Sequence, residues 1–165
     1  MATAMKTGMR NRRGKEAAMT LREILEDKGT GFVTIRPNAS LLKVTRLFHE
    51  RAISSVIVTN IGGRPLGIVT DRLIIEALAT RGADALALSA ADLMETPIPT
   101  ADLDDRVSHA MSVMTQRRVR HLLILDDARP VGIVSIGDLV KARLRDADLE
   151  TRVLRDLAAA HMSAA

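Results

Sequence analysis

The chain of 165 residues is long enough for one domain or two very small ones, and its 47% of apolar residues can supply a packed core. It has no cysteine, which excludes disulfides, thiolate nucleophiles and cysteine-ligated zinc and fits a reducing compartment, so we expect a cytoplasmic protein. No segment has the length and apolar character of a membrane-spanning helix or a signal peptide, so we expect no membrane association.

The net charge of +4 is local to the first residues of the chain. Residues 1–19 hold five basic side chains and one acidic side chain, so the remainder is electrically balanced. This segment has no apolar periodicity, and we expect residues 1–20 to be a disordered basic tail. It is either a solubilising arm or an arm that contacts nucleic acid or anionic lipid. We favour the first, because a few basic residues are weak evidence for nucleic-acid binding.

The first regular elements are a helix, a short strand and a second helix. Residues 21–29 predict the first helix, and Val33–Ile35 predict an extended segment. A polar turn then offers a helix cap at Asn38 or Ser40. The helix that follows is amphipathic, with apolar residues at helical spacing at Leu41, Val44, Leu47 and Phe48.

Two β-rich runs come next, SVIVT and LGIVT, on either side of a turn at Gly62–Gly63. Their nearly continuous apolar character indicates neighbouring strands with at least one buried face. A closing helix begins near Asp71, which completes a first unit over residues 21–82. A linker then leads to a short helical segment at residues 89–96, in the place that residues 21–29 hold before the first unit.

The pattern then repeats. Ile98–Ala101 predict an extended segment, a helix cap falls at Asp104 or Asp105, and two strands, LLILD and VGIVS, flank a turn at residues 126–128. The closing helix begins near Gly137. The amphipathic helix between these elements carries apolar residues at Val107, Ala110, Met111 and Met114.

The two units align at a spacing of about 66 residues, and each reads β-α-β-β-α over about 50 residues. A unit of that size cannot bury its apolar faces alone, so we expect an α/β fold in which the units at 21–82 and 83–145 pack as an intramolecular pair with pseudo-two-fold symmetry. Residues 146–165 extend the last helix, with Asp148 and Arg152 spaced for an ion pair. This extension carries an apolar stripe, which we expect to dock on a dimer partner or else on its own pair, at Leu149, Val153, Leu154 and Leu157.

The echoed segments PLGIVTDRLII and PVGIVSIGDLV, in units of this order, closely resemble a tandem pair of CBS domains, the Bateman module. The resemblance covers residues 21 to about 145. The segments LREILEDKG, DLMETP, MTQRRVRHLLILDD and GIVSIGDLVKARL are similar to stand-alone bacterial CBS-pair proteins associated with signal transduction. The resemblance implies a regulatory module that requires no cofactor and forms a homodimer. It also implies that the module binds an adenosyl ligand such as AMP, ATP or NAD in clefts between the repeats.

The strongest candidate site residues are Ser135 and Asp138. The resemblance implies that Asp138 accepts hydrogen bonds from the ribose hydroxyls and that Ser135 helps to hold phosphate. The chemistry agrees, because a carboxylate can accept both donors of a diol, and the strand-to-helix turn at Ser135, Ile136 and Gly137 presents backbone amides to an anion. The alternative is that Asp138 only caps its helix.

The resemblance implies further candidates. It places Ile98 and Thr100 near the adenine, although they are also ordinary core-strand positions. It places Arg120 and His121 near phosphates, unless they only end a helix. Thr70 and Arg72 could contribute from the first unit.

The first unit has Leu73 in the place of Asp138, and it has Ser54 and Ser55 in the places of Arg120 and His121. Two arrangements stay open. One is a single asymmetric site for a ligand that needs few contacts to phosphate, and the other is two half-sites that together bind a dinucleotide such as NAD.

No pairing of a nucleophile with a base, no metal-ligand motif and no phosphate loop of the Walker type is present in the sequence, which argues against an enzyme. We therefore expect a sensor of adenine nucleotides with an unidentified downstream protein. The alternatives are a structural dimerisation module that has lost its ligand and a protein that binds nucleic acid through the basic tail.

Overall fold

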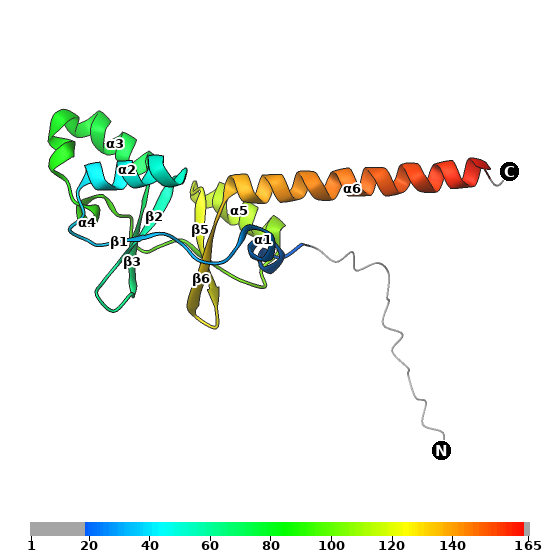
Figure 1. The fold of residues 1–165 in the computed structure, drawn as a ribbon, viewed down its shortest axis with the longest axis horizontal. Helices are drawn as coiled ribbons and strands as arrows, with labels where there is room; N and C mark the ends of the chain where they lie inside the picture. The colour runs from blue at the N-terminus through cyan, green and yellow to red at the C-terminus, as the bar shows by residue number, and fades with distance from the viewer. Residues whose placement is uncertain (1–18, 164–165) are drawn as a thin grey trace, which may run out of the picture.

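Two three-stranded sheets with their flanking helices form the body of the protein, and one long helix projects from it (Figure 1). The structure is a computed structural model that describes residues 19–163, with side chains as far as Asp156. The predicted basic tail therefore lies outside the described residues, apart from Met19 and Thr20.

Both repeats have the predicted β-α-β-β-α order, which confirms the fold class. In each sheet the middle strand pairs in parallel with the first strand and antiparallel with the third. The first repeat and the helix before it comprise α1 Leu21–Lys28, β1 Thr34–Ile35, α2 Leu41–Arg51, β2 Ser55–Thr59, β3 Pro65–Thr70 and α3 Asp71–Arg81. The linker and second repeat comprise η1 Gly82–Ala87, α4 Ala90–Leu93, β4 Thr100–Asp102, α5 Val107–Arg117, β5 His121–Asp126, β6 Arg129–Ser135 and α6 Ile136–Ser163.

The helix caps agree with the sequence in the first repeat and differ in the second. Ser40 caps α2 by accepting a hydrogen bond from the backbone N–H of Lys43, which confirms one of the two predicted caps. The prediction of Asp104 or Asp105 as the cap of α5 is wrong, because the N-cap residue is Arg106 and has no side-chain cap bond.

Backbone from a distant part of the chain replaces the missing cap. The N–H of Val107, the first residue of α5, donates to the carbonyl of Met19 at 2.9 Å, so the segment before α1 satisfies this donor. The two aspartates are used elsewhere: Asp105 accepts from the N–H of Asp102 at 3.0 Å, and Asp104 pairs with Arg22 on α1 at 2.9 Å.

The helices that precede the repeats are exchanged between them. The apolar side of α1 packs on the second repeat, and α4 packs on the first (Figure 1). Leu21, Ile24 and Leu25 of α1 belong to the same buried cluster as Val134 and Leu139 of the second repeat. Each repeat thus completes its core with the helix that precedes the other repeat in sequence.

A third cluster joins the two sheets. Ile57 of β2, Ile68 of β3 and Leu123 of β5 are each at most 2% exposed, and Phe32 and Ile133 pack against them. Burial of these apolar side chains holds the two sheets against each other, and it confirms that the repeats form an intramolecular pair.

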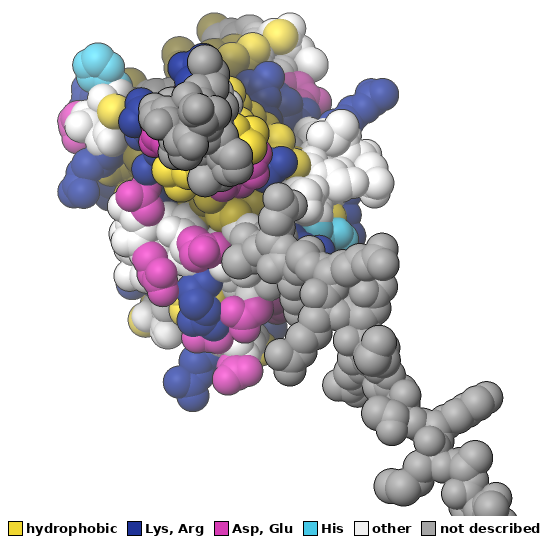
Figure 2. All heavy atoms as spheres, turned by 90° about the vertical axis from the view of Figure 1, so that its right-hand side faces the viewer, with side chains coloured by type: hydrophobic (Ala, Val, Ile, Leu, Met, Phe, Trp, Pro, Cys, Tyr) yellow, Lys and Arg dark blue, Asp and Glu magenta, His cyan; other side chains and the backbone are white. Residues whose placement is uncertain are grey.

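The long helix α6 leaves the body beyond Arg145 (Figure 1) and points toward the viewer in Figure 2. Arg145 pairs with Asp27 of α1 at 2.7 Å. Leu149, Val153 and Leu154 are exposed, while the side chain of Leu157, the fourth member of the predicted stripe, lies outside those that the structure describes. The expected ion pair of Asp148 with Arg152 is not formed within the described residues. Instead, one turn earlier, Arg143 pairs with Asp146 at 3.1 Å.

Close packing at Gly67 predicts a destabilised variant. A Cβ atom added at Gly67 would lie 2.7 to 2.9 Å from three side-chain atoms of Met94, including its Cβ, so Gly67→Ala must push the end of α4 away from β3. We expect a loss of about 1–3 kcal/mol of unfolding free energy, measured by urea denaturation. Gly62→Ala is the matched control, since its Cβ would meet only Asn60 at 3.5 Å. Equal stability of the two variants would contradict this packing argument.

Candidate functional site

A cleft of about 340 Å³ opens between the two repeats, within the range of about 300–1,000 Å³ that is common for small-molecule sites. Asp138 and Ser135 line it from the second repeat, and residues 52–55 line it from the first. The remaining lining residues are Lys28, Gly31, Phe32, Val33, His121 and Ile133. The cleft is therefore built by both repeats and by the exchanged helix α1.

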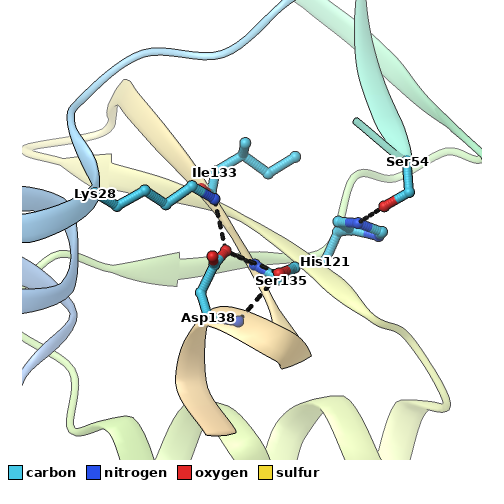
Figure 3. A network of polar contacts seen from close by, with 6 residues as sticks. All are labelled: Lys28, Ser54, His121, Ile133, Ser135 and Asp138. Carbon is cyan, nitrogen blue, oxygen red and sulfur yellow. Dashed lines mark hydrogen bonds and ion pairs between the residues drawn. The ribbon is translucent and has the colours of Figure 1, made fainter. Parts of the chain in front are cut away.

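The carboxylate of Asp138 is held by three donors that share one oxygen (Figure 3). Its Oδ2 accepts from Lys28 Nζ at 2.5 Å, from the Ser135 backbone N–H at 2.7 Å and from Ser135 Oγ at 2.8 Å. Ser135 Oγ in turn accepts from the Asp138 backbone N–H at 3.2 Å. This reciprocal pair is a capping box at the start of α6, so Asp138 does cap its helix, and its expected ligand role stays a prediction.

Capping leaves the other carboxylate oxygen available. The Asp138 side chain is 26% exposed, and no donor within residues 19–163 reaches its Oδ1. Asp138 can therefore cap the helix through one oxygen and accept a ligand hydroxyl through the other.

Lys28 is the functional residue that the sequence did not indicate. It is the last residue of α1, and its Nζ donates both to Asp138 and to the carbonyl of Ile133, at 3.1 Å. The motif around Asp138 is local, whereas Lys28 arrives from 110 positions earlier through the exchange of α1. Only knowledge that α1 packs on the second repeat could have placed it here.

These contacts fix the charge of the cleft. Burial raises the pKa of Asp138, but the hydrogen bonds from Lys28 and Ser135 outweigh burial and hold this pKa below its usual range. Asp138 is therefore ionised at neutral pH and forms an ion pair with Lys28 at one wall of the cleft.

The opposite wall is small and neutral. It consists of Ala52, which ends α2 in the left-handed conformation with φ of 50°, and the three residues that follow it. Ser54 Oγ lies 3.0 Å from His121 Nε2, a contact that joins the two repeats (Figure 3). Burial lowers the pKa of His121, so its imidazole is neutral at pH 7 and supplies a hydrogen bond rather than a positive charge.

A second cleft occupies the pseudo-symmetric position and is nearly closed, with a volume of about 20 Å³. Two of its lining residues, Arg72 and Glu95, pair with each other at 3.6 Å, and Arg72 also pairs with Glu76 of its own helix at 3.3 Å. Thr70 accepts from the N–H of Leu73 at 3.4 Å, the same cap that Ser135 makes with Asp138, but without a carboxylate. The second cleft therefore holds Arg72 and Arg120 together with Asp71 and Glu95, but it has Leu73 where the first cleft has Asp138.

The ten predicted site residues do not form one site. Ser135 and Asp138 line the first cleft, and His121 lines both clefts. The second cleft receives Thr70, Arg72 and Arg120. Ile136 lies beside Arg118 and Arg120 in an adjoining groove, Gly137 is exposed in the first turn of α6, Ile98 packs on the central cluster, and Thr100 is exposed on β4.

The segment expected near the adenine, Ile98 to Thr100, does not line the cleft that contains Asp138. Pro99, between Ile98 and Thr100, lines the second cleft, whereas Gly31, Phe32 and Val33 occupy the equivalent place beside Asp138. The repeat alignment carried the signal, since it sets Phe32 and Val33 opposite Ile98 and Pro99. The ligand roles of all these residues stay predictions.

Two kinds of feature are absent from the described residues, a cluster of metal ligands and a helix suited to cross a membrane. Between residues 19 and 163, no group of three or more His, Asp or Glu side chains is arranged to hold a metal ion. In the same part of the chain, no helix combines the length and the apolar character needed to cross a membrane.

The fold and the cleft define a two-repeat α/β module with a ligand-sized opening between its repeats. The sequence matches the CBS domain family over residues 19–80 and 90–145, and the chain belongs to this family. CBS-domain pairs are generally regulatory modules that bind adenosyl ligands.

Solved structures and sequence relatives agree with this assignment. A CBS-domain-containing protein of Agrobacterium tumefaciens superimposes with a TM-score of 0.74 at 34% identity, over 76% of this chain and 99% of that one. A candidate signal-transduction protein with CBS domains from Burkholderia ambifaria gives 0.70 at 29%, over 78% and 96%. An uncharacterized protein of Methanopyrus kandleri is 28% identical over 66% of this chain, which spans 56% of that relative's length. A mitochondrial CBS-domain-containing protein of Arabidopsis thaliana is 24% identical, and 64% of its length is spanned.

The ion pair at Asp138 predicts a loss of stability in acid. Because the folded-state pKa of Asp138 is lowered, its contribution is fully present above the ordinary pKa of about 3.9 and is lost as the pH falls through the lowered value. At about pH 7 the free energy of unfolding, measured with urea, should be larger for wild type than for Asp138→Asn, and this difference should shrink towards about pH 3. In a Lys28→Met background the difference in free energy of unfolding should already be smaller at neutral pH. A difference that is constant with pH would contradict an ionic role for Asp138.

Proposed function

We propose that this chain is a regulatory sensor that binds an adenosine-containing ligand in the cleft at Asp138. One observation carries the proposal: an ionised carboxylate, with one oxygen held by Lys28 and Ser135, faces a cleft of about 340 Å³ between the two repeats. A ribose offers two neighbouring hydroxyl donors, which suit the second oxygen of such a carboxylate. The segment from Gly31 to Val33 and the side chain of Ile53, which line the cleft, would receive the base.

The charges favour a ligand with few phosphates. Among the described residues, Lys28 is the one cation that lines this cleft, and it is engaged with Asp138, while His121 is neutral. Arg120 and Arg72 lie in the second cleft. Adenosine or AMP therefore fits the described residues better than ATP. A dinucleotide such as NAD would also need the second cleft, and the pairing of Arg72 with Glu95 would first have to open.

Ligand binding would act through the relation of the two repeats. The cleft wall at residues 52–55 belongs to the first repeat and Asp138 to the second, so a ligand that contacts both stabilises one arrangement of the pair. We propose that this arrangement is read by an unidentified downstream protein in the cytoplasm and that the chain itself catalyses no reaction.

We also propose a homodimer. Exposed apolar side chains lie on equivalent positions of the closing helices of the two repeats, at Ile75 on α3, 65% exposed, and Val140 on α6, 40% exposed. A self-complementary pairing of this face would bury both in a symmetric contact.

A second candidate function is a structural dimerisation module without a ligand. It is favoured by the completeness of the internal contacts, because within the described residues every buried side-chain nitrogen and oxygen already has a partner. Nucleic-acid binding would depend on the basic tail, which lies outside the described residues, and we propose no such role.

The ligand proposal predicts a selective effect of Asp138→Ala. In thermal-shift assays with adenosine, AMP, ATP, NAD and S-adenosylmethionine, we expect AMP or adenosine to raise the Tm of the wild type. A ligand at a hundred times its Kd adds about 2.7 kcal/mol. Asp138→Ala should lose this ligand-dependent increase.

Asp92→Ala is the matched control, because Asp92 forms the same capping box with Ser89 at the start of α4 but lines neither cleft. This variant should lose its cap and keep its response to ligand. Equal responses of Asp138→Ala and wild type would remove the proposed site. If no compound shifted the wild type, the structural module would be the better description.

A further inference from the structure

The helix α6 continues well past the residues that match the CBS domain. The match ends at residue 145, and the helix runs to Ser163 (Figure 1). From Ala147 to Asp156 every residue is exposed, and the pair of Arg145 with Asp27 is the last described ion pair between α6 and another element. Most of the stability of a helix in a protein comes from packing its apolar face, so this extension gains stability if it packs on another surface.

One face of α6 has the spacing of a coiled-coil seam. Val140, Leu144, Ala147, Thr151 and Leu154 follow one another at alternating steps of four and three residues, and all five are exposed. Leu144 is 62% exposed and Leu154 is 66% exposed. These are the a and d positions of a heptad repeat. Of the seven ways to place a heptad on residues 140–156, this one alone puts no charged residue in the seam.

The charges beside the seam match a second copy of the same helix. The g positions are Arg143 and Glu150, and the e positions that follow them are Asp148 and Arg155. In a parallel, in-register pair, each g residue faces the e residue five positions later on the other helix. Arg143 then faces Asp148 of the second copy, Glu150 faces Arg155 of the second copy, and both pairs are of opposite sign.

An antiparallel pair is matched less well. If Thr151 faces Leu154 of the second copy, only Asp148 and Arg155 make pairs of opposite sign. If the pair is shifted so that Ala147 faces Thr151, Asp148 and Glu150 each meet their own like-charged copy. The parallel arrangement therefore uses all four flanking charges without repulsion.

We propose that residues 140–156 of α6 pair two copies of this chain as a parallel, in-register coiled coil. Val140 begins the seam on the face of the closing helices that the proposed homodimer would bury, so the coiled coil prolongs that contact away from the body. Ala147 and Thr151 make the seam weaker than one built of leucine. The coiled coil therefore supplements the contact between the two CBS-domain pairs of the proposed homodimer and does not replace it. The pairing does not depend on a nucleotide at Asp138.

Cysteine cross-linking tests the orientation, since the chain has no cysteine of its own. In a parallel pair each seam residue faces its own copy, so Thr151→Cys and Leu154→Cys should each form a disulfide-linked dimer under mild oxidation, visible on a non-reducing gel. Asp156→Cys, on the outer side of the helix, is the control and should stay monomeric on the gel. Cross-linking only in a mixture of the first two variants would show an antiparallel pair and overturn the proposal. So would the absence of cross-links in both.

Charge exchange tests the register. In the Leu154→Cys background, Glu150→Arg places two positive charges together, and we expect disulfide formation to slow several-fold. Adding Arg155→Glu reverses both charges and should restore the rate. Asp156→Arg makes the same change of charge outside the seam and should leave the rate unchanged. An unaffected rate in Glu150→Arg, or no recovery in the doubly exchanged chain, would contradict this register.

Discussion

The helix α1 precedes the first repeat in sequence but buries Leu21, Ile24 and Leu25 against the second. The short helix α4 does the converse, since it precedes the second repeat and packs on the first. Neither repeat has a complete core without the helix that precedes the other repeat, so the two cannot separate without exposing apolar surface. This exchange fixes how the sheets meet at Ile57, Ile68 and Leu123, and it carries Lys28 to the carboxylate of Asp138. Both the cleft and its charge follow from it.

The duplicated architecture supports two clefts that differ in chemistry. Asp138 gives the first cleft an acid that both caps α6 and faces the opening, while Leu73 leaves its counterpart with the cap alone. At another equivalent position the charge lies on the other side, with Arg120 in the nearly closed cleft and Ser54 in the open one, where Lys28 of α1 is the basic residue. Main-chain geometry requires the strand-to-helix turn in both repeats, but it does not require the carboxylate. Divergence could therefore alter the charge of each cleft while leaving the fold intact.

Local patterns predicted the elements well, because capping, turn and periodicity signals act within a few residues. Ser40 and the repeat of β-α-β-β-α were found in this way. Asp104 and Asp105 failed as caps because the carbonyl of Met19, distant in sequence, takes that place on α5. The motif at Ser135 and Asp138 marked one wall of the cleft. Lys28 could not be found, since nothing in its neighbourhood indicates that α1 crosses to the other repeat.

The exchange of α1 also has a consequence for the order in which the chain is made. Synthesis proceeds from the N-terminus, so α1 leaves the ribosome before its packing partners on β6 and α6 exist. Lys28 of α1 contacts Asp138 across 110 positions of the sequence, and Asp27 contacts Arg145 across 118. These are among the most distant pairs in sequence that the fold brings together. While the first repeat is already complete in sequence, the apolar side of α1 stays exposed to water or to chaperones. Docking of this first helix is thus expected to be among the last steps of folding.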